Sequence, residues 1–290
     1  MPAVARLNAV ALWLYLQSAG VAVTTDCKTT AIQWQPWETQ LAATGRYTNP
    51  YTDVELSVNY TTPDGTVRSA LGFWDGGAVW RIRSFFDRPG QWQWESSSSD
   101  AGLRQSGAVT VAPAAKAASS SDRTNPFFTH GRLHAASGRA YLEHADGAPF
   151  FWLGDTAWAG PMRSTPSEWT EYLADRKRLG FTAVQSGIAC PWAGGTTRRG
   201  DLPFTDKGNN LTKLNPAFFQ VFADRIAQAS EAGFAVLIVG LMEPSYRYPT
   251  FSEASRFARH LTARLAHYNN IIFSPSFDSG YMWLGNLIGN

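Results

Sequence analysis

Residues 149–158 read Pro-Phe-Phe-Trp-Leu-Gly-Asp-Thr-Ala-Trp. The continuous apolar run from Phe150 to Leu153 predicts a strand buried on both faces, as the strands of a parallel sheet are. Asp155 and Trp158 follow it directly, and α/β barrels build their active sites at this point, past the carboxyl end of a strand. Taken alone, the pattern is explained more simply by a core strand and a helix-capping Asp. The segments that follow discriminate between these interpretations.

Three more strand-like segments follow, and segments with helical periodicity separate them. The apolar runs that predict these strands lie at residues 181–188, 234–241 and 270–277. Thr165-Pro166 and Asn215-Pro216 each combine an N-cap residue with proline at the first helical position, and a third helix is predicted from Ser252 to about Ala266. This alternation predicts right-handed βαβ units and a parallel sheet.

Polar and aromatic side chains gather near the ends of these predicted strands: Asp155, Trp158, Gln185, Trp192, Glu243, Asp278 and Trp283. Taken alone, each of these residues is explained by a role as a helix cap or by a place in a loop exposed to water. Together at one rim of a barrel they would line a cleft with carboxyl groups and aromatic rings. Glycoside hydrolysis needs carboxyl groups as acid, base or nucleophile, and aromatic faces for the sugar. The sequence therefore predicts substrate contacts from Asp155, Trp158, Gln185 and Trp192.

Residues 24–112 are predicted to form an all-β, immunoglobulin-like sandwich. Apolar positions from Val54 to Tyr60 alternate with polar residues, and the turn signal Pro63-Asp64-Gly65 joins them to a second strand at 67–71. Further short strands are predicted at 79–82, 91–94 and 109–111. Several short strands separated by turns are typical of this fold.

Six of the chain's 12 Trp residues fall in this segment, at positions 34, 37, 74, 80, 92 and 94. Rings that face outward could stack on sugars, whereas rings that face inward fill the core. Glutamines at positions 33, 35, 91 and 93 alternate with the tryptophans, which places each Trp pair on one strand face. This pattern favours the core.

A linker is predicted to separate the sandwich from a second domain. Residues 113–125 consist mainly of Ala, Ser, Lys and Pro, with almost no large apolar side chain. The second domain is expected to cover residues 126–290. It is predicted to open with a hairpin between Phe127 and Asp146, around a turn at Ser137-Gly138.

The composition allows a sizeable core and excludes an obvious nucleic-acid partner. With 290 residues, 44% of them hydrophobic and 17% charged, the chain is long enough for one large or two ordinary domains. The net charge is +2 with acids and bases interspersed, so the basic footprint of a nucleic-acid-binding protein is missing from the sequence. No residue spacing is typical of a metal site, and neither a metal nor another cofactor is predicted.

Residues 1–22 are predicted to be a secretory signal peptide. Arg6 supplies the positive charge, residues 9–16 the short apolar stretch, and Gly20-Val21-Ala22 the small residues of a cleavage site. Because the apolar stretch is too short for a membrane span, a secreted protein with no membrane contact is expected after cleavage. The alternative is a retained amphipathic anchor.

Two further features bear on export. Glycosylation sequons, which agree with export, begin at Asn59 and Asn210. Cys27 and Cys190 are the only cysteines, and they are compatible either with one disulfide or with two free thiols.

Several sequence blocks resemble one known family. In the first domain the blocks are Tyr47-Thr-Asn-Pro-Tyr51, Gly72-Phe-Trp-Asp-Gly-Gly77, Gly90-Gln-Trp92 and Ser99-Asp-Ala-Gly-Leu103. They resemble the β-sandwich domain of unknown function that precedes apiosidase-like glycoside hydrolases. In the second domain the blocks are Phe150–Trp158, Glu168-Trp169 with Tyr172-Leu173 and Arg176, Gly180–Gln185, and Asn270-Ile271-Ile272. They resemble the catalytic domain of the same family.

The resemblance implies a (β/α)8 barrel that hydrolyses O-glycosyl bonds in plant or microbial polysaccharides or oligosaccharides. It also implies a catalytic Asp at the end of the fourth strand, within a Gly-Gly-Asp motif. Asp278 occupies that position and is the predicted acid/base, although both glycines are missing and Pro275 precedes it. The second catalytic residue of the family, a Glu on a later strand, has no counterpart among the 290 residues.

A complete eight-stranded barrel takes about 250 residues, whereas residues 126–290 hold only the first four predicted strands. The chain is therefore expected to form about half of a barrel and to be inactive alone. It is then either a truncated part of a longer protein, which we favour, or a half-barrel that has lost catalysis. Two other functions remain open, a non-catalytic carbohydrate-binding protein and a structural adhesion module without sugar specificity.

Overall fold

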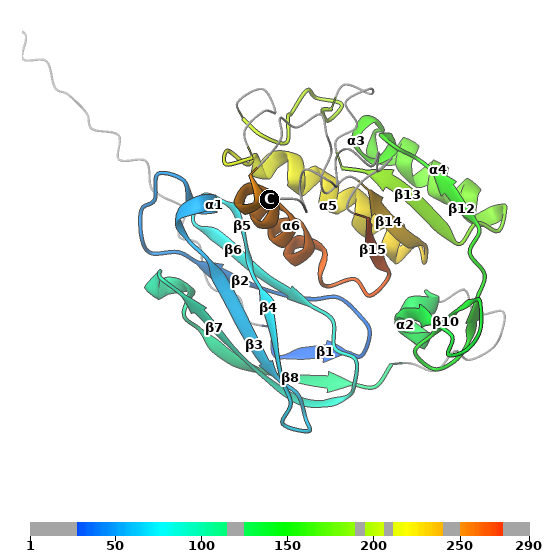
Figure 1. The fold of residues 1–290 in the computed structure, drawn as a ribbon, viewed down its shortest axis with the longest axis horizontal. Helices are drawn as coiled ribbons and strands as arrows, with labels where there is room; N and C mark the ends of the chain where they lie inside the picture. The colour runs from blue at the N-terminus through cyan, green and yellow to red at the C-terminus, as the bar shows by residue number, and fades with distance from the viewer. Residues whose placement is uncertain (1–27, 115–124, 189–194, 206–210, 240–249, 275–290) are drawn as a thin grey trace, which may run out of the picture.

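The computed structural model describes residues 28–114, 125–188, 195–205, 211–239 and 250–274 (Figure 1). These residues form a largely antiparallel β-sandwich followed by a parallel sheet with helices, so the fold class expected from the sequence is confirmed. In these ranges no helix is both long and apolar enough to cross a membrane. The predicted signal peptide, most of the predicted linker and both cysteines lie outside the described residues.

The sandwich consists of two sheets. The larger has strand order β1-β8-β7-β3-β4, and its pairs are antiparallel except for β1 with β8. Its strands are β1 (Thr30–Ile32), β3 (Leu56–Thr61), β4 (Val67–Leu71), β7 (Gly90–Ser98) and β8 (Ser106–Ala112). The smaller sheet has the order β2-β6-β5 and contains β2 (Trp37–Ala42), β5 (Phe73–Gly76) and β6 (Val79–Ser84). Two short helices, α1 (Pro50–Asp53) and η1 (Ala101–Leu103), complete this part.

Aromatic rings fill the core of the sandwich. Trp37, Trp80, Trp92 and Trp94 are each at most 3% exposed, and the other two tryptophans of the segment are half-buried. The Trp37 ring meets the Phe86 ring edge-on, with centroids 5.5 Å apart. The prediction that these rings belong to the core is thus confirmed.

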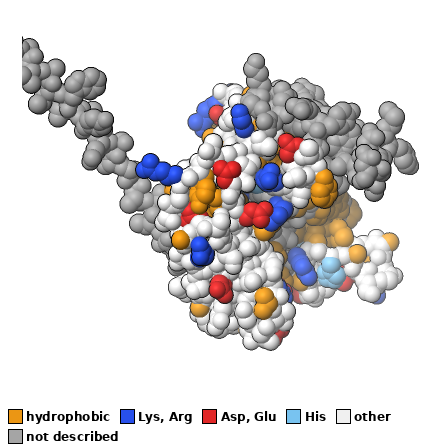
Figure 2. Space-filling model, turned by 60° about the vertical axis from the view of Figure 1, so that its left-hand side comes forward, with side chains coloured by type: hydrophobic (Ala, Val, Ile, Leu, Met, Phe, Trp, Pro, Cys, Tyr) orange, Lys and Arg blue, Asp and Glu red, His pale blue; other side chains and the backbone are white. Residues whose placement is uncertain are grey.

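On the face shown in Figure 2, acidic and basic side chains are interspersed over a mostly polar surface.

Asp100 ties together two loops of the sandwich. Its carboxylate accepts hydrogen bonds from the backbone N–H groups of Thr44 (3.0 Å), Gly45 (2.7 Å) and Gly102 (2.7 Å), and from the Tyr47 hydroxyl (2.9 Å). Burial favours a higher pKa for this carboxyl, but the hydrogen bonds outweigh it and lower the pKa to about 2. The ionised carboxylate is therefore the form that the fold stabilises.

A small antiparallel sheet follows the sandwich. It comprises β9 (Leu133–Ala135), β10 (Leu142–His144) and β11 (Pro149–Phe150), and helix α2 (Pro126–His130) precedes it. The β9–β10 pair is the hairpin predicted between Phe127 and Asp146. Phe127 is fully buried against Ala183 and Ala235 of the parallel sheet, so this unit closes the amino-terminal end of that sheet.

The predicted strand from Phe150 to Leu153 is wrong. Phe150 ends β11, whereas Phe151, Trp152 and Leu153 belong to no strand and are 75%, 40% and 37% exposed. The first parallel strand is β12 (Gly154–Thr156), so Asp155 lies within a strand instead of after it. Among the described strands β12 pairs only with β13, at the edge of the sheet. The apolar run before it therefore has no covering layer in this part of the chain.

The parallel sheet has the sequential order β12-β13-β14-β15, as βαβ units require. Its other strands are β13 (Ala183–Gly187), β14 (Ala235–Val239) and β15 (Ile271–Ser274). The helices between them are α3 (Gly160–Arg163), α4 (Pro166–Arg178), α5 (Pro216–Glu231) and α6 (Phe251–Leu265). Thr165 and Thr250 form capping boxes with Glu168 and Glu253, which fixes the first turns of α4 and α6.

Helices α5 and α6 lie between the parallel sheet and the sandwich (Figure 1). Polar contacts join the two parts across these helices. Gln220 of α5 donates to the carbonyl of Asp75 at 2.8 Å, and Arg83 of β6 donates to the carbonyl of Arg264 at 2.7 Å. Asn269, just before β15, donates to the carbonyls of Trp34 (3.0 Å) and Phe127 (2.9 Å). The sandwich is therefore bonded directly to the helical layer of the parallel sheet.

Candidate active site at the carboxyl ends of the parallel strands

The strand register defines two faces of the parallel sheet. Four aligned positions share one face: Thr156, Gln185, Leu237 and Ile272. The alternate positions, such as Asp155 and Val184, point to the opposite face because side chains alternate along a strand. Val184 and Val236 pack there in the core formed with the helices. The first face corresponds to the interior of a barrel, and active-site groups are expected at its carboxyl end.

Asp155 lies on the helix-covered face and is held by α4. The Tyr172 hydroxyl donates to Asp155 Oδ2 at 2.9 Å, and Arg176 Nη1 lies 3.4 Å from the same oxygen. Oδ1 accepts from the backbone N–H of Thr156 at 2.8 Å. Burial, and then the bond to Asp155, raise the pKa of Tyr172, so this hydroxyl remains a donor at neutral pH. The contact of Asp155 with substrate stays a prediction.

Gln185 comes from β13, and Trp158 comes from the segment that follows the neighbouring strand β12. Gln185 is half-buried in the middle of β13, on the face opposite to Asp155. Trp158 follows β12, and its carbonyl accepts hydrogen bonds from the Gly187 N–H (3.0 Å) and the Ser186 hydroxyl (3.2 Å). These bonds hold the segment after β12 against the carboxyl end of β13. The roles of Gln185 and Trp158 in sugar binding stay predictions.

The other predicted site residues lie outside the described residues: Trp192, Glu243, Asp278 and Trp283. The predicted acid/base, Asp278, is therefore not placed relative to Asp155 and Gln185. In the part of the chain that the structure describes, no group of three or more His, Cys, Asp and Glu side chains is arranged to hold a metal ion.

Two residues of the site, Tyr172 and Arg176, were not assigned a role from the sequence. They lie four positions apart on α4 and so share one helix face. The Tyr172 ring stacks on Trp169 with centroids 5.1 Å apart, and the Arg176 guanidinium lies 5.3 Å from the Tyr172 ring centroid. A Tyr and an Arg at this spacing, in the helix that follows an Asp-bearing strand, are the signal that could have identified them.

Two family models match the chain. Residues 30–99 match a domain of unknown function (DUF5060), and residues 136–283 match the apiosidase-like catalytic domain. A comparison with curated proteins finds no match.

Solved structures also resemble the chain. A candidate glycoside hydrolase from Bacteroides vulgatus ATCC 8482 is 22% identical with a TM-score of 0.71, and the alignment covers 89% of this chain and 50% of that one. This likeness shows the fold. A protein named glycoside hydrolase is 27% identical, with a TM-score of 0.45 and coverage of 51% of this chain and 34% of its own. A glycoside hydrolase family 5 protein from Bacteroides vulgatus ATCC 8482 is 25% identical, with a TM-score of 0.46 and coverage of 53% and 34%.

The chain spans half the length of the first of these structures and about a third of the other two. The last two similarities, at TM-scores below one half, add no argument. The catalytic-domain model, in contrast, covers slightly more than half of the 290 residues. With the sandwich in front and the parallel strands behind it, the chain belongs to the apiosidase-like family of glycoside hydrolases.

Proposed function

We propose that this protein is a secreted glycoside hydrolase that cleaves O-glycosyl bonds in a plant or microbial polysaccharide. One observation carries the proposal: four parallel strands follow in sequential order, with Gln185 in β13 and Trp158 in the segment after the neighbouring strand β12, in a chain of this family. An amide and an indole ring suit the hydroxyl groups and the C–H faces of a sugar. Export rests on the predicted signal peptide at residues 1–22.

The proposed reaction is hydrolysis with Asp278 as one of two carboxyl groups. In glycosidases one carboxyl group protonates the leaving oxygen while the other acts as base or nucleophile. Asp278 follows the fourth strand, and Trp192 would add a second aromatic surface for the sugar. The partner of Asp278 is a Glu expected on a later barrel strand. The 290-residue chain alone should therefore bind an oligosaccharide without hydrolysing it.

Asp155 supports the proposed site in one of two ways. It either binds a sugar hydroxyl directly or positions the segment that carries Trp158. The second role draws on its bonds to Tyr172 and to the Thr156 N–H, which fix the end of β12 against α4. The two roles differ in what removal of the Tyr172 hydroxyl does to sugar affinity.

The experiment measures binding and hydrolysis separately, with a panel of plant and microbial polysaccharides. It uses the 290-residue chain and a protein extended by four further strand–helix units. The extended protein should release reducing ends, and Asp278→Asn should remove most of that rate while leaving binding nearly intact. Trp158→Ala should weaken binding in both proteins.

Robust hydrolysis by residues 23–290 alone would show that the second catalytic carboxyl group lies within these residues and not on a later barrel strand. Binding without hydrolysis by the extended protein would favour a non-catalytic carbohydrate-binding protein instead.

A further inference from the structure

The connection between β13 and α5 borders the candidate active site. It starts at the carboxyl end of β13 and ends at Asn215, the N-cap residue of α5. In (β/α)8 barrels, connections from a strand to the next helix build the active site. Two described stretches of this connection, residues 202–205 and 211–215, run antiparallel and form a bridge between Phe204 and Leu214. We call these two stretches the rim hairpin.

The rim hairpin is bonded to the segment that carries Trp158. Helix α3 begins two residues after Trp158, and its Met162 carbonyl accepts a hydrogen bond from the Arg198 N–H at 2.9 Å. Arg198 belongs to a tight turn in which the Thr197 hydroxyl donates to the Asp201 carboxylate at 2.8 Å. Asp201 directly precedes the rim hairpin. A displacement of the hairpin would therefore reach the segment after β12.

The Asn49 side chain of the sandwich binds the rim hairpin instead of its own helix. Asn49 is the N-cap residue of α1, where an Asn side chain normally accepts a hydrogen bond from the first helical turn. Here it makes no such bond, and its Nδ2 donates to the carbonyl of Thr212 at 2.6 Å. The Asp53 carboxylate accepts from the Asn49 N–H at 2.9 Å, so α1 fixes the backbone from which this amide extends.

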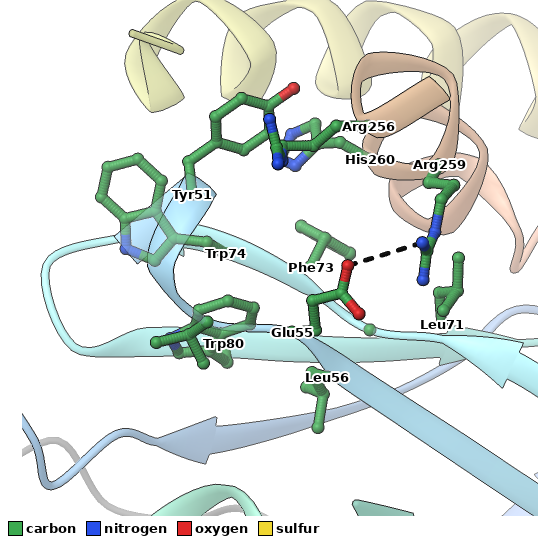
Figure 3. A pocket seen from close by; sticks show the side chains of 12 residues that line it. Tyr51, Glu55, Leu56, Leu71, Phe73, Trp74, Trp80, Arg256, Arg259 and His260 are labelled. Carbon is green, nitrogen blue, oxygen red and sulfur yellow. Dashed lines mark ion pairs between the residues drawn. The ribbon is translucent and has the colours of Figure 1, made fainter. Parts of the chain in front are cut away.

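Tyr51 extends from α1 in the same direction. It is 5% exposed and belongs to the buried cluster that contains Phe204 and Leu214 of the rim hairpin, not to the core of the sandwich. Figure 3 shows its ring directed from α1 toward α6, where it meets the His260 ring edge-on with centroids 5.4 Å apart. The sequence Asn49-Pro-Tyr51 is therefore the part of the sandwich that docks on the parallel-sheet part.

A second contact fixes the point where the rim hairpin enters α5. The turn between β5 and β6 lies against Pro216, the first residue of α5, and a Cβ placed on Gly76 would lie 3.4 Å from the Pro216 Cβ. One turn along α5, Gln220 donates to the Asp75 carbonyl. The sandwich thus contacts both the hairpin and the helix that follows it.

We propose that the sandwich positions the active-site rim, with Asn49 as the positioning residue that holds the rim hairpin through Thr212. The sandwich would then act on sugar binding without contacting the sugar. The bracing rests on the contacts of Asn49 and Tyr51, whereas its effect on sugar binding rests on the proposed function. Burial of four of the six sandwich tryptophans agrees with this role, because buried rings offer no face to a sugar.

The first measurement is hydrogen–deuterium exchange of the 290-residue protein, followed by mass spectrometry in the rim hairpin. Asn49→Ala removes the donor to Thr212, so exchange in the hairpin should rise by about fivefold. Asn49→Asp should raise the exchange at least as much. Asp is as good an N-cap for α1 as Asn, but its carboxylate oxygen would face the Thr212 carbonyl without a proton to donate.

Asn59→Ala is the matched control. Asn59 lies on β3 of the same sandwich, and its side chain accepts a hydrogen bond from the Ser69 hydroxyl at 2.7 Å, away from the rim hairpin. This variant should exchange like the wild type in the hairpin. Thermal unfolding of each variant verifies that it is folded.

The second measurement is the affinity of the same variants for the plant or microbial polysaccharide that binds the wild type most tightly, determined by calorimetry. Both Asn49 variants should bind it severalfold more weakly than the wild type, and Asn59→Ala should bind it equally well. A sandwich that contacts the sugar itself, in contrast, would keep its affinity when only the amide of Asn49 is lost.

The other outcomes separate the brace from the proposed function. Unchanged exchange in both Asn49 variants would overturn the brace. Faster exchange in Asn49→Ala but not in Asn49→Asp would assign Asn49 to the capping of α1 alone. Faster exchange with unchanged polysaccharide affinity would overturn the effect on binding. A wild type that binds no polysaccharide would contradict the proposed function, while the exchange measurement would still decide whether Asn49 holds the hairpin.

Discussion

Asp75 on β5 and Arg264 on α6 form an ion pair buried between the sandwich and the parallel sheet, with Nη1 2.8 Å from Oδ1. The two side chains are 7% and 1% exposed, respectively. Arg81 also donates to Asp75, at 2.6 Å, so the carboxylate lies between two guanidinium groups. Burial lowers the pKa of Arg264 to about 10, with Asp75 opposing the shift, and Arg264 is therefore charged at neutral pH. The two parts of the chain meet across a desolvated charge pair.

Removing only one member of this pair should be costly. Arg264→Met leaves the Asp75 carboxylate buried with one cation fewer, and we expect the free energy of unfolding to fall by about 3–5 kcal/mol. The double variant Asp75→Asn/Arg264→Met should recover much of the loss, because it removes both buried charges. Urea denaturation followed by circular dichroism measures both changes.

The control for the ion pair is Arg68→Met. Arg68 pairs with Asp87 at 2.9 Å but is 42% exposed, and such surface pairs contribute at most about 1 kcal/mol. A double variant less stable than Arg264→Met, or equal losses in the buried and the exposed pair, would contradict this account.

Asp100 should make the sandwich sensitive to acid. Its pKa is about 2 in the folded protein, below its ordinary value near 3.9. Its stabilisation is therefore fully present above about pH 5 and is lost as the pH falls through 3.9 toward 2. The shift corresponds to about 2 kcal/mol at neutral pH. The Asp100→Asn variant should lack this stabilisation at pH 7. Its free energy of unfolding, measured by urea denaturation, should also change less between pH 5 and pH 2 than that of the wild type. Glu95→Gln, an exposed carboxyl on β7, should retain the wild-type profile.

The role of Asp155 can be read from a pair of variants at the proposed active site. If Asp155 positions Trp158 through Tyr172, Tyr172→Phe and Asp155→Asn should weaken oligosaccharide binding by a similar factor, severalfold, because either breaks the 2.9 Å bond. If Asp155 binds a sugar hydroxyl itself, Asp155→Asn should weaken binding much more than Tyr172→Phe. Calorimetric titration with the oligosaccharide that binds best gives both factors, and unchanged binding in both variants would exclude both roles.

Two tryptophans provide a matched test of burial. Trp37 is 2% exposed in the sandwich core, so Trp37→Ala should lower the free energy of unfolding by about 3–5 kcal/mol. Trp152 is 40% exposed before β12, so Trp152→Ala should cost less than about 1 kcal/mol. Denaturation of both variants in urea measures the difference. A large loss for Trp152→Ala would mean that another layer covers this residue in solution.

Local signals in the sequence are sufficient to predict much of the fold. The capping box of Thr165 with Glu168 and the apolar periodicity of α4 depend on neighbouring residues, so both are visible in one segment. The alternation of Trp92 and Trp94 with glutamines likewise indicates one buried strand face.

Non-local packing could not be predicted in this way. Whether the run from Phe150 to Leu153 is buried depends on what lies beside the edge strand, and the run itself carries no information on that point. The pairing of Asp75 with Arg264 joins segments far apart in the chain and has no local pattern. For the same reason, the sequence predicts Asp155 at the carboxyl end of the first strand without its partner Tyr172.

The bonds from Asn269 to Trp34 and Phe127 can form only late in biosynthesis. Asn269 and Trp34 are 235 positions apart, and a ribosome delivers the amino-terminal part first, at about 5–20 residues per second. The sandwich can therefore fold on the order of ten seconds before α6 and Asn269 emerge. During that interval Phe73 and Trp74, which later meet the helical layer, face water on the nascent chain. A chaperone that shields this surface until α6 arrives would act at the step where the chain is most open to misassembly.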